Sequence, residues 1–235
     1  MGYTLDNKGL GLMRTATILF CYNRPKYLKK TLESINEIID YAYVDYSRKQ
    51  GQILSLLRGR VKNIILRDVH YGLSANIIHG VTQVFQSGYD SVIVIEDDLI
   101  LGYYFFPYMR NGLEFFGRKY LGSISSNKTN PLMFNSHGWG TWKDIWDRVD
   151  WRFEDEIDET GFGSIRSDLP AMYRRAREGK IDSWAIRFSY FHFKNHLNCE
   201  PSLVPLCKHI GKNGTNYNFF SNFGIRQYLR KWKII

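Results

Sequence analysis

The chain has 235 residues, of which 44% are hydrophobic and 16% aromatic, so it can build a large core and does not have the composition of a disordered protein. No uninterrupted apolar run of about 18 residues occurs, so we expect no membrane-spanning helix. The 32 Lys and Arg residues exceed the 23 Asp and Glu residues and give a net charge of +9. This surplus predicts an anionic partner: nucleic acid, a phosphate-bearing small molecule or an anionic membrane surface.

The N-terminus and the cysteines indicate a cytoplasmic protein. Residues 1–13 lack the charged start and the apolar stretch of a signal peptide, and we expect them to be an extension outside the fold. Cys21, Cys199 and Cys207 do not have the spacing of a metal site, and an odd number is poor evidence for a disulfide framework. Both features favour a reducing compartment.

Strands and helices alternate along residues 15–120. The predicted strands are 15–23, 41–47, 61–68 and 90–98, and the predicted helices are 24–39, 52–59, 72–88 and 102–120. The strands are continuous apolar runs rather than alternating ones, which is typical of strands buried on both faces. The sequence therefore predicts an α/β fold whose mostly parallel central sheet has helices on both faces.

The pattern changes after residue 120. A strand-like segment at 120–128 is followed by a Trp/Gly-rich segment, a polar helical region (153–180), a helix (182–197) and a last strand (201–211). No linker separates two domains, so we expect a single domain over 14–235. Within it, 14–120 and 121–216 form two halves with different roles, and 217–235 is a basic amphipathic tail.

Three adjacent acids, Glu96, Asp97 and Asp98, end the fourth predicted strand. In open parallel sheets, ligands bind beyond the carboxyl ends of the strands. Carboxylates there suit Mg²⁺ or Mn²⁺, which typically take one or two protein carboxylates and fill their other positions with phosphate oxygens and water. The acids therefore indicate a metal ion that bridges the protein to an anionic ligand; the alternative is a solvated acidic turn.

The segment with the acids and five further sequence blocks, in unbroken order, resemble GT-A-fold glycosyltransferases, in particular a bacterial group distantly similar to the N-acetylglucosaminyltransferase that opens complex N-glycan synthesis. The first two blocks are "FCYNRPKYLKKTLESI" and "HYGLSANIIHGV", which precede "VIVIEDDLILGYYFFPYM" with the acids. Further blocks follow in "SHGWGTWKDIWDRVDW", "IDSWAIRF" and "SLVPLCKHIGKNGTN". The resemblance covers about residues 15–216 and implies a Rossmann-like nucleotide-binding half fused to an acceptor-binding half.

The resemblance implies an enzyme that transfers a sugar from a nucleotide-diphosphate sugar to a hydroxyl of a saccharide or lipid-linked acceptor, with inversion and with Mn²⁺ or Mg²⁺. Such enzymes act in the assembly of bacterial surface polysaccharides such as lipopolysaccharide or capsule. In this reading Asp98 is the metal ligand, and Asp97 and Glu96 contact the ribose and the sugar. Tyr22 and Arg24, after the first strand, are expected to contact the nucleotide.

Other donor-binding roles are implied for residues outside the acid cluster. Asp45, after the second strand, matches a position that contacts the base. Trp139 is expected to pack on a sugar, with core packing as the alternative. Lys212, in a segment that departs from the family's usual "GFDG", is expected to contact a phosphate; a Gly/Asn surface turn is the alternative.

Asp182 matches the aspartate that acts as catalytic base in related inverting enzymes. Inverting transfer requires a carboxylate that takes the proton of the acceptor hydroxyl while the nucleotide leaves from the opposite face. The alternative role for Asp182 is a helix N-cap, because it directly precedes a predicted helix.

Competing functions remain open from the sequence alone: a catalytically inactive nucleotide-sugar-binding homologue, and a metal-dependent nucleotidyltransferase. Nucleic-acid binding is not expected, because the basic residues are scattered and no recognised motif occurs. The basic residues of the tail "IRQYLRKWKII" alternate with apolar ones, which suits an anionic membrane surface and suits an ordinary terminal helix equally. Peripheral attachment to the inner face of the plasma membrane is therefore an open expectation.

Overall fold

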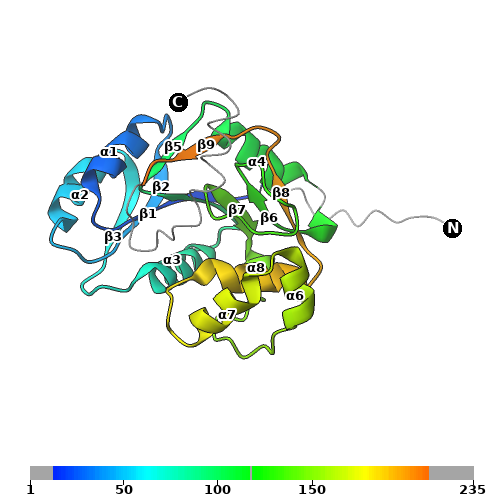
Figure 1. The fold of residues 1–235 in the computed structure, drawn as a ribbon. Helices are drawn as coiled ribbons and strands as arrows, with labels where there is room; N and C mark the ends of the chain where they lie inside the picture. Colours follow the sequence, from blue (N-terminus) through cyan, green and yellow to red (C-terminus); the bar gives the residue numbers. More distant parts are fainter. Residues whose placement is uncertain (1–12, 117, 212–235) are drawn as a thin grey trace, which may run out of the picture.

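The computed structural model describes residues 13–116 and 118–211, in which a seven-stranded sheet runs through the molecule (Figure 1). In spatial order its strands are β3 (Val61–Leu66), β2 (Ile39–Val44), β1 (Thr15–Cys21), β4 (Ser91–Glu96), β7 (Trp139–Trp142), β6 (Leu121–Ser125) and β8 (Asn198–Pro201). All neighbouring strands are parallel except β7, which is antiparallel to both β4 and β6. The prediction of a mostly parallel α/β sheet is confirmed.

Helices cover both faces of this sheet (Figure 1). They are α1 (Pro25–Glu33), α2 (Gln50–Leu57), α3 (Leu73–Gln86), α4 (Phe105–Phe115), the short α5 (Lys143–Trp146), α6 (Glu159–Ile165), α7 (Leu169–Arg177) and α8 (Trp184–Lys194), with a 3₁₀ turn at Arg118–Tyr120. Figure 1 shows α3 and α8 on one side of the sheet and α1 and α4 on the other. The predicted helical region 153–180 forms two separate helices, α6 and α7.

Several predicted elements are shorter in the structure, such as the helix predicted for 102–120, which spans Phe105–Phe115, and two differ in other ways. The helix predicted for 24–39 ends at Glu33, and Ile39 already begins β2, because Ile35 and Ile39 are buried on the way into the sheet. The strand predicted for 201–211 is wrong as a single element. It divides between β8 and a separate strand, β9 (Cys207–His209), which pairs antiparallel with β5 (Leu99–Leu101) directly after the acids.

The core consists of two clusters of buried apolar side chains. The larger cluster includes residues of β1, β2 and β4 together with Trp142, Trp146 and Cys199, so it joins the segments before and after residue 120. The smaller cluster lies among α6, α7 and one face of α8, around Phe162 and Tyr173. Helix α8 contributes to both clusters and therefore attaches the small helical part to the sheet.

The expected role of Trp139 as a sugar platform is wrong for its side chain. Trp139 lies in β7 with 0% exposure and packs among Phe134, Trp146 and Trp184, whose ring centroids are 4.9 to 5.9 Å away. The neighbouring glycines, which suggested close approach of a ligand, instead allow other parts of the core to approach. A Cβ on Gly140 would lie 2.9 Å from the carbonyl oxygen of Val92. The core alternative therefore holds.

Buried His192 makes the stability of the fold sensitive to acid. Its Nδ1 lies 2.7 Å from the carbonyl oxygen of Phe188, so Nδ1 carries the proton, and Nε2 accepts from the Ser123 hydroxyl at 2.8 Å. Burial lowers the pKa of His192 from 6.5 to about 4. A charged imidazole would lie in this apolar cluster without the water that solvates it in the unfolded chain.

We expect the contribution of His192 to the free energy of unfolding to fall as the pH is lowered from 6.5 to about 4, because in that window its imidazole binds a proton in the unfolded chain and not in the folded chain. The slope from this one group is at most about 1.4 kcal/mol per pH unit. Urea unfolding across the window measures it. His192→Gln should flatten the slope, and an unchanged slope in that variant would contradict the assignment.

Candidate functional site

The predicted site residues follow strands that end at the same edge of the sheet. Strands β1, β2 and β4 are parallel, with Cys21 opposite Val44 and Phe20 opposite Glu96. The chain segments that leave these three strands must therefore start side by side. They carry Tyr22 and Arg24 after β1, Asp45 after β2, and Asp97 and Asp98 after β4.

Arg24 joins the two aspartates of the acid cluster. Its Nη2 lies 2.8 Å from Oδ1 of Asp97, and its Nη1 lies 2.6 Å from Oδ2 of Asp98. The backbone N–H of Tyr22 donates to the other oxygen of Asp97 at 3.0 Å. Asp97 and Asp98 are 2% and 1% exposed, and two buried carboxylates side by side require such a partner. The acids are therefore a built site and not a solvated turn.

His209 completes this cluster from the far end of the sequence. Its Nε2 lies 3.1 Å from Oδ2 of Asp98, and the backbone N–H of Ile210 donates to the carbonyl oxygen of Asp98 at 2.9 Å. The ring of His137, which lies just before β7, stacks on His209 with a centroid distance of 4.9 Å. The sequence prediction left His209 out of the metal set. The signal for it is the β5–β9 pairing, which brings residue 209 beside the strand that follows the acids.

Two observations test whether the cluster suits a divalent cation. Oδ1 of Asp98 is buried and has no hydrogen-bond partner, so an acceptor is left over for a ligand. The chain also passes so close to Asp98 at Gly211 that a Cβ there would clash with Oδ2 of Asp98. Only glycine therefore leaves this carboxylate uncovered. Asp98 and His209 together fit a cation that takes few protein ligands and completes its shell with phosphate oxygens and water.

The fit has a limit that bears on the chemistry. Among residues 13–116 and 118–211, no group of three His, Cys, Asp or Glu side chains is arranged to hold a metal ion. Arg24 also occupies Oδ2 of Asp98. Residues 13–116 and 118–211 therefore offer an incomplete set of cation ligands, and a cation bound there would need further oxygens from another molecule.

The charges in the cluster are unequal. Burial, together with the charges of the nearby Asp98 and Asp97, raises the pKa of Glu96 to about 8. Burial likewise raises the pKa of Asp97 to about 6, against the effect of Arg24. Burial acts in the same direction on Asp98, but the hydrogen bond from His209 and the charge of Arg24 outweigh it, so the pKa of Asp98 lies below its usual value. Asp98 is the acid held most firmly in the charged form.

Asp45 organises a second part of the site, the loop between β3 and α3. Its carboxylate accepts the backbone N–H groups of Tyr46 and Tyr71 at 2.8 Å and of Gly72 at 3.1 Å, and it lies 2.8 Å from Nδ1 of His70. With 3% exposure and several donors, this carboxylate holds the loop in place more than it faces a ligand. We therefore expect the loop residues that Asp45 orients, rather than Asp45 itself, to contact the base.

A cavity of about 390 Å³ opens beside this loop. It is lined by Tyr22, Asn23, Tyr46, Ser47, Arg48, Lys49 and His70. The rings of Tyr22 and His70 stack at one wall with centroids 4.8 Å apart. Because Tyr22 also donates to Asp97, the cavity adjoins the acid cluster. Aromatic faces with adjacent cations suit a flat, phosphate-bearing ligand.

Asp182 lies at the other end of the same loop. Its Oδ2 accepts the backbone N–H of Leu73 at 2.7 Å, and its Oδ1 accepts that of Ser74 at 3.1 Å, so it caps the start of α3 from a distant part of the chain. Gly72 makes room for it, because a Cβ there would lie 2.9 Å from Oδ2, and its φ of +79° favours glycine. Asp182 is exposed and does not cap its own helix α8. The alternative prediction, that Asp182 caps the helix it precedes, is therefore wrong, because Asp182 caps α3 instead.

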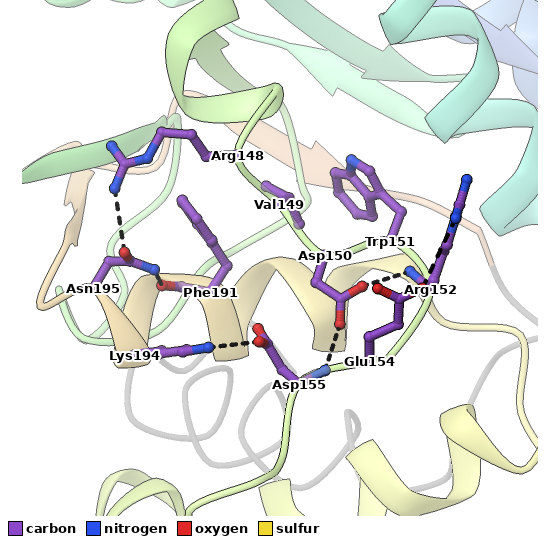
Figure 2. Close-up of a pocket in the computed structure, with 10 residues that line it drawn as sticks. All are labelled: Arg148, Val149, Asp150, Trp151, Arg152, Glu154, Asp155, Phe191, Lys194 and Asn195. Carbon is purple, nitrogen blue, oxygen red and sulfur yellow. Dashed lines mark hydrogen bonds and ion pairs between the residues drawn. The ribbon is translucent and has the colours of Figure 1, made fainter.

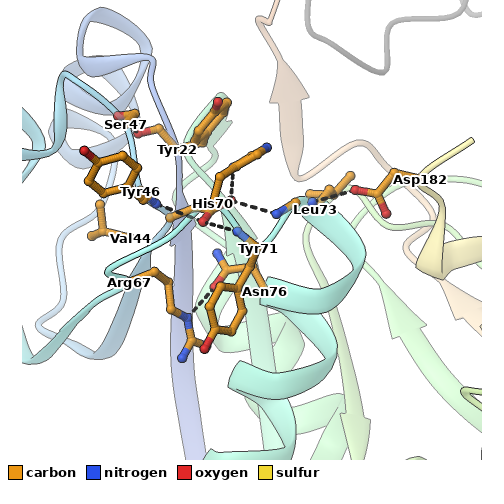
Figure 3. Close-up of polar contacts among 12 residues, drawn as sticks. Tyr22, Val44, Tyr46, Ser47, Arg67, His70, Tyr71, Leu73, Asn76 and Asp182 are labelled. Atoms are coloured by element: carbon orange, nitrogen blue, oxygen red, sulfur yellow. Dashed lines mark hydrogen bonds and ion pairs between the residues drawn. The ribbon is translucent and has the colours of Figure 1, made fainter.

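Contacts therefore connect most of the predicted site residues with one another, from the acid cluster through Tyr22 and the loop 70–74 to Asp182. Figure 3 shows Tyr22 and Asp182 on opposite sides of the loop that carries His70 and Leu73. Tyr22 also contacts Asp97 through its backbone N–H, and Arg24 pairs with both Asp97 and Asp98. Lys212 lies outside the residues that the structure describes, so its predicted phosphate contact stays a prediction.

A larger hollow of about 630 Å³ lies elsewhere, between the segment after α5 and the end of α8 (Figure 2). Its polar groups contact one another: Lys194 pairs with Asp155, Arg152 pairs with Glu154, and Arg148 donates to the side-chain oxygen of Asn195. Asp150 accepts the backbone N–H groups of Arg152 and Asp155. Because these polar groups already satisfy each other, the smaller cavity beside the buried acids is the better candidate site.

No protein-family model and no curated protein matches the chain. Its structure is similar to that of the glycosyltransferase GlyE of Streptococcus pneumoniae, with 14% identity and a TM-score of 0.47 over 89% of this chain and 57% of GlyE. It is also similar to the galactosyltransferase LgtC in complex with donor and acceptor sugar analogs, with 10% identity and a TM-score of 0.46 over 91% and 94% of the two chains.

A third similar structure is a cytidylyltransferase from Leptospira borgpetersenii, with 7% identity and a TM-score of 0.45 over 71% of this chain and 73% of that one. All three TM-scores lie below 0.5, and these likenesses do not establish the family to which the chain belongs.

Proposed function

We propose that the protein is a metal-dependent glycosyltransferase that moves a sugar from a nucleotide-diphosphate sugar to a hydroxyl of a saccharide or lipid-linked acceptor, with inversion. The observation that carries the proposal is the pair of buried aspartates, bridged by Arg24, directly beside an aromatic and basic cavity at the carboxyl ends of the strands. Assembly of bacterial surface polysaccharide is the proposed context, as the sequence resemblance implies.

The cavity beside Tyr22 would take the nucleoside. Tyr22 and His70 offer ring faces for the base, and Arg48 and Lys49 offer positive charge. Asp97, which contacts Tyr22 and Arg24, and the adjacent Glu96 are proposed to contact the ribose and the sugar. A raised pKa suits Glu96 for that role, because a protonated carboxyl can donate a hydrogen bond to a sugar oxygen.

Asp98, with His209 beside it, would hold Mn²⁺ or Mg²⁺. When bound, the ion supplies positive charge where the departing diphosphate accumulates negative charge. Arg24 is within reach of the same region, and its guanidinium can pair with a phosphate as well as with a carboxylate. The unpaired Oδ1 of Asp98 and the close approach at Gly211 support this assignment.

Asp182 is proposed as the general base. In inverting transfer the acceptor hydroxyl oxygen bonds to the anomeric carbon as the bond to the nucleotide diphosphate breaks, and the hydroxyl proton passes to a carboxylate. Asp182 is exposed and lies across the loop 70–74 from Tyr22, so an acceptor can approach it from solvent. Its two backbone donors hold it in one orientation.

Thermal unfolding with nucleotides tests the proposal. We expect UDP, GDP or dTDP to raise the unfolding temperature only with Mn²⁺ or Mg²⁺, because the ion and the diphosphate complete each other's contacts. Stabilisation of about 2.7 kcal/mol corresponds to ligand at 100 times its dissociation constant. Duplex DNA is the control for the net positive charge, and stabilisation by DNA alone would overturn the proposal.

Enzyme assays then separate the remaining alternatives. A panel of nucleotide sugars should reveal slow, metal-dependent hydrolysis of one donor. Nucleotide binding without any hydrolysis would indicate an inactive nucleotide-sugar-binding homologue. Release of pyrophosphate from a nucleoside triphosphate and a sugar phosphate would indicate a nucleotidyltransferase.

The proposed location is the cytoplasm, with the tail 217–235 as a possible contact to an anionic membrane. That tail lies outside the described residues, so this role stays a prediction. Among the helices that the structure describes, none combines the length and the apolar character needed to cross a bilayer.

A further inference from the structure

Four exposed apolar side chains form a surface that the proposed function does not use: Tyr103, Tyr104, Leu203 and Val204, which we call the ribbon-end patch. Their exposed fractions are 79%, 67%, 92% and 59%. The rings of Tyr103 and Tyr104 contact each other edge to face at 5.1 Å instead of packing into the core. Leaving side chains of this size in water forgoes about 1.5 to 3 kcal/mol each.

The two segments of the patch leave the same end of one antiparallel ribbon. Leu101 of β5 faces Cys207 of β9, and the N–H of Gly102 donates to the carbonyl oxygen of Leu206 at 2.7 Å. Tyr103 and Tyr104 follow the first strand, and Leu203 and Val204 precede the second. Figure 1 shows β5 and β9 side by side, with the connection from β8 leading into β9.

The connection 203–205 is fastened at both ends. The N–H of Ser202 donates to the carbonyl oxygen of Ser125 at 3.0 Å, and that of Leu206 donates to the carbonyl oxygen of Ser126 at 2.8 Å. The Ser202 hydroxyl also donates to the carbonyl oxygen of Val204 at 2.7 Å. The backbone therefore holds Leu203 and Val204 out toward solvent in a defined loop.

The surroundings of the patch are basic. The segments 99–113, 121–143 and 201–211, which contain the patch and the strands next to it, have no Asp or Glu residue. Lys208 is exposed on β9, and exposed Lys128 follows Asn127, whose side chain contacts Sγ of Cys207. The partly exposed Glu200 lies three positions before Leu203. Aliphatic and tyrosine side chains at a loop tip beside two exposed lysines match the interface of an anionic bilayer.

We propose that the ribbon-end patch docks the protein on the surface of an anionic membrane. The apolar tips enter the headgroup region, and the flanking lysines contact the lipid charges. The other end of the same ribbon carries His209 against Asp98. Five positions separate Asp98 from Tyr103, and five separate Val204 from His209, so at about 3.3 Å each the acid cluster lies roughly 16 Å or less from the patch. If the proposed function holds, a lipid-linked acceptor is the class of substrate that this placement suits.

Vesicle sedimentation tests the docking without any activity measurement. The full chain should bind vesicles of phosphatidylcholine with phosphatidylglycerol and should bind pure phosphatidylcholine weakly. Combining Tyr103→Ser, Tyr104→Ser, Leu203→Ser and Val204→Ser should weaken binding by about tenfold or more, because each change removes apolar surface from the contact. These side chains are exposed, so thermal unfolding of the variant should match that of the unmodified chain.

The control changes exposed apolar residues outside the patch: Ile38→Ser with Phe115→Ser, at 60% and 72% exposure. This variant should bind vesicles like the unmodified chain. Full binding by the patch variant would place the membrane contact elsewhere, for example in the tail, and would overturn the proposal. Absence of binding by the unmodified chain, or a dimer that the patch changes convert to monomers in light scattering, would overturn it too. Metal-dependent stabilisation by UDP is a separate readout, so the two proposals can fail independently.

Discussion

Asp98→Asn is expected to remove Mn²⁺-dependent binding of the nucleoside diphosphate, with a loss of more than about 100-fold in affinity. Asparagine has the same shape, but it replaces a full negative charge by a neutral amide, and the pKa of Asp98 shows that this acid is the one held in the charged form. Its unpaired Oδ1 is also the acceptor left free for an ion. Calorimetric titration of UDP with and without Mn²⁺ measures the effect.

The stability of the same variant provides a second readout. Breaking a buried ion pair outright costs about 3–5 kcal/mol, because one charge is left alone. Here Arg24 keeps its contact with Asp97, so we expect a smaller loss, about 1–3 kcal/mol, in metal-free urea unfolding. The matched control is Asp144→Asn, which removes an exposed carboxylate paired with Arg118. Undiminished Mn²⁺-dependent binding in Asp98→Asn would show that the ion is held elsewhere.

The part of the site that follows β1, β2 and β4 was predictable from the sequence. Continuous apolar runs predict parallel strands, and parallel strands end at a common edge, so Tyr22, Arg24, Asp45 and the acids had to lie together. The distribution of roles was less predictable. Asp45 is nearly covered by backbone donors from the loop at 70–72, and no local pattern in the sequence reports such donors.

The approach of His209 and Gly211 to Asp98 could not be predicted from the sequence. They approach Asp98 because two strands of three residues each, about 100 positions apart in the chain, pair as β5 and β9. Strands this short have no periodicity to detect. The misassignment of Trp139 has a different cause. Tryptophans beside glycines suit a sugar platform and a tightly packed core equally, and only the contacts of β7 distinguish the two.

Asp182→Asn is expected to reduce sugar transfer by about 100-fold or more while leaving Mn²⁺-dependent binding of the donor nucleotide intact. Asparagine can still accept a backbone hydrogen bond at the start of α3, but it cannot take the proton of an acceptor hydroxyl. Transfer to acceptor, donor hydrolysis and nucleotide binding are measured on the same preparation. Equal loss of binding and transfer would contradict the division of roles between Asp98 and Asp182.

Because Asp182 caps α3, the loss of this cap is a competing explanation for a loss of transfer in Asp182 variants. A lost cap costs about 0.5–2 kcal/mol of stability. A folded protein measured well below its unfolding temperature loses little active fraction from such a cost, so a cap alone cannot produce a 100-fold loss of transfer. Asp182→Ala removes both the cap and the carboxylate, whereas Asp182→Asn removes chiefly the carboxylate.

The comparison of these two variants decides the role. If Asp182 is the base, both lose transfer alike, although only the alanine variant is clearly less stable. If Asp182 serves only to position the loop 70–74, the asparagine variant keeps transfer, and the alanine variant loses nucleotide binding together with transfer, because His70 and its stacking partner Tyr22 line the cavity that this loop borders. Transfer that survives in Asp182→Asn would therefore move the proton chemistry to another group and leave Asp182 as the cap of α3.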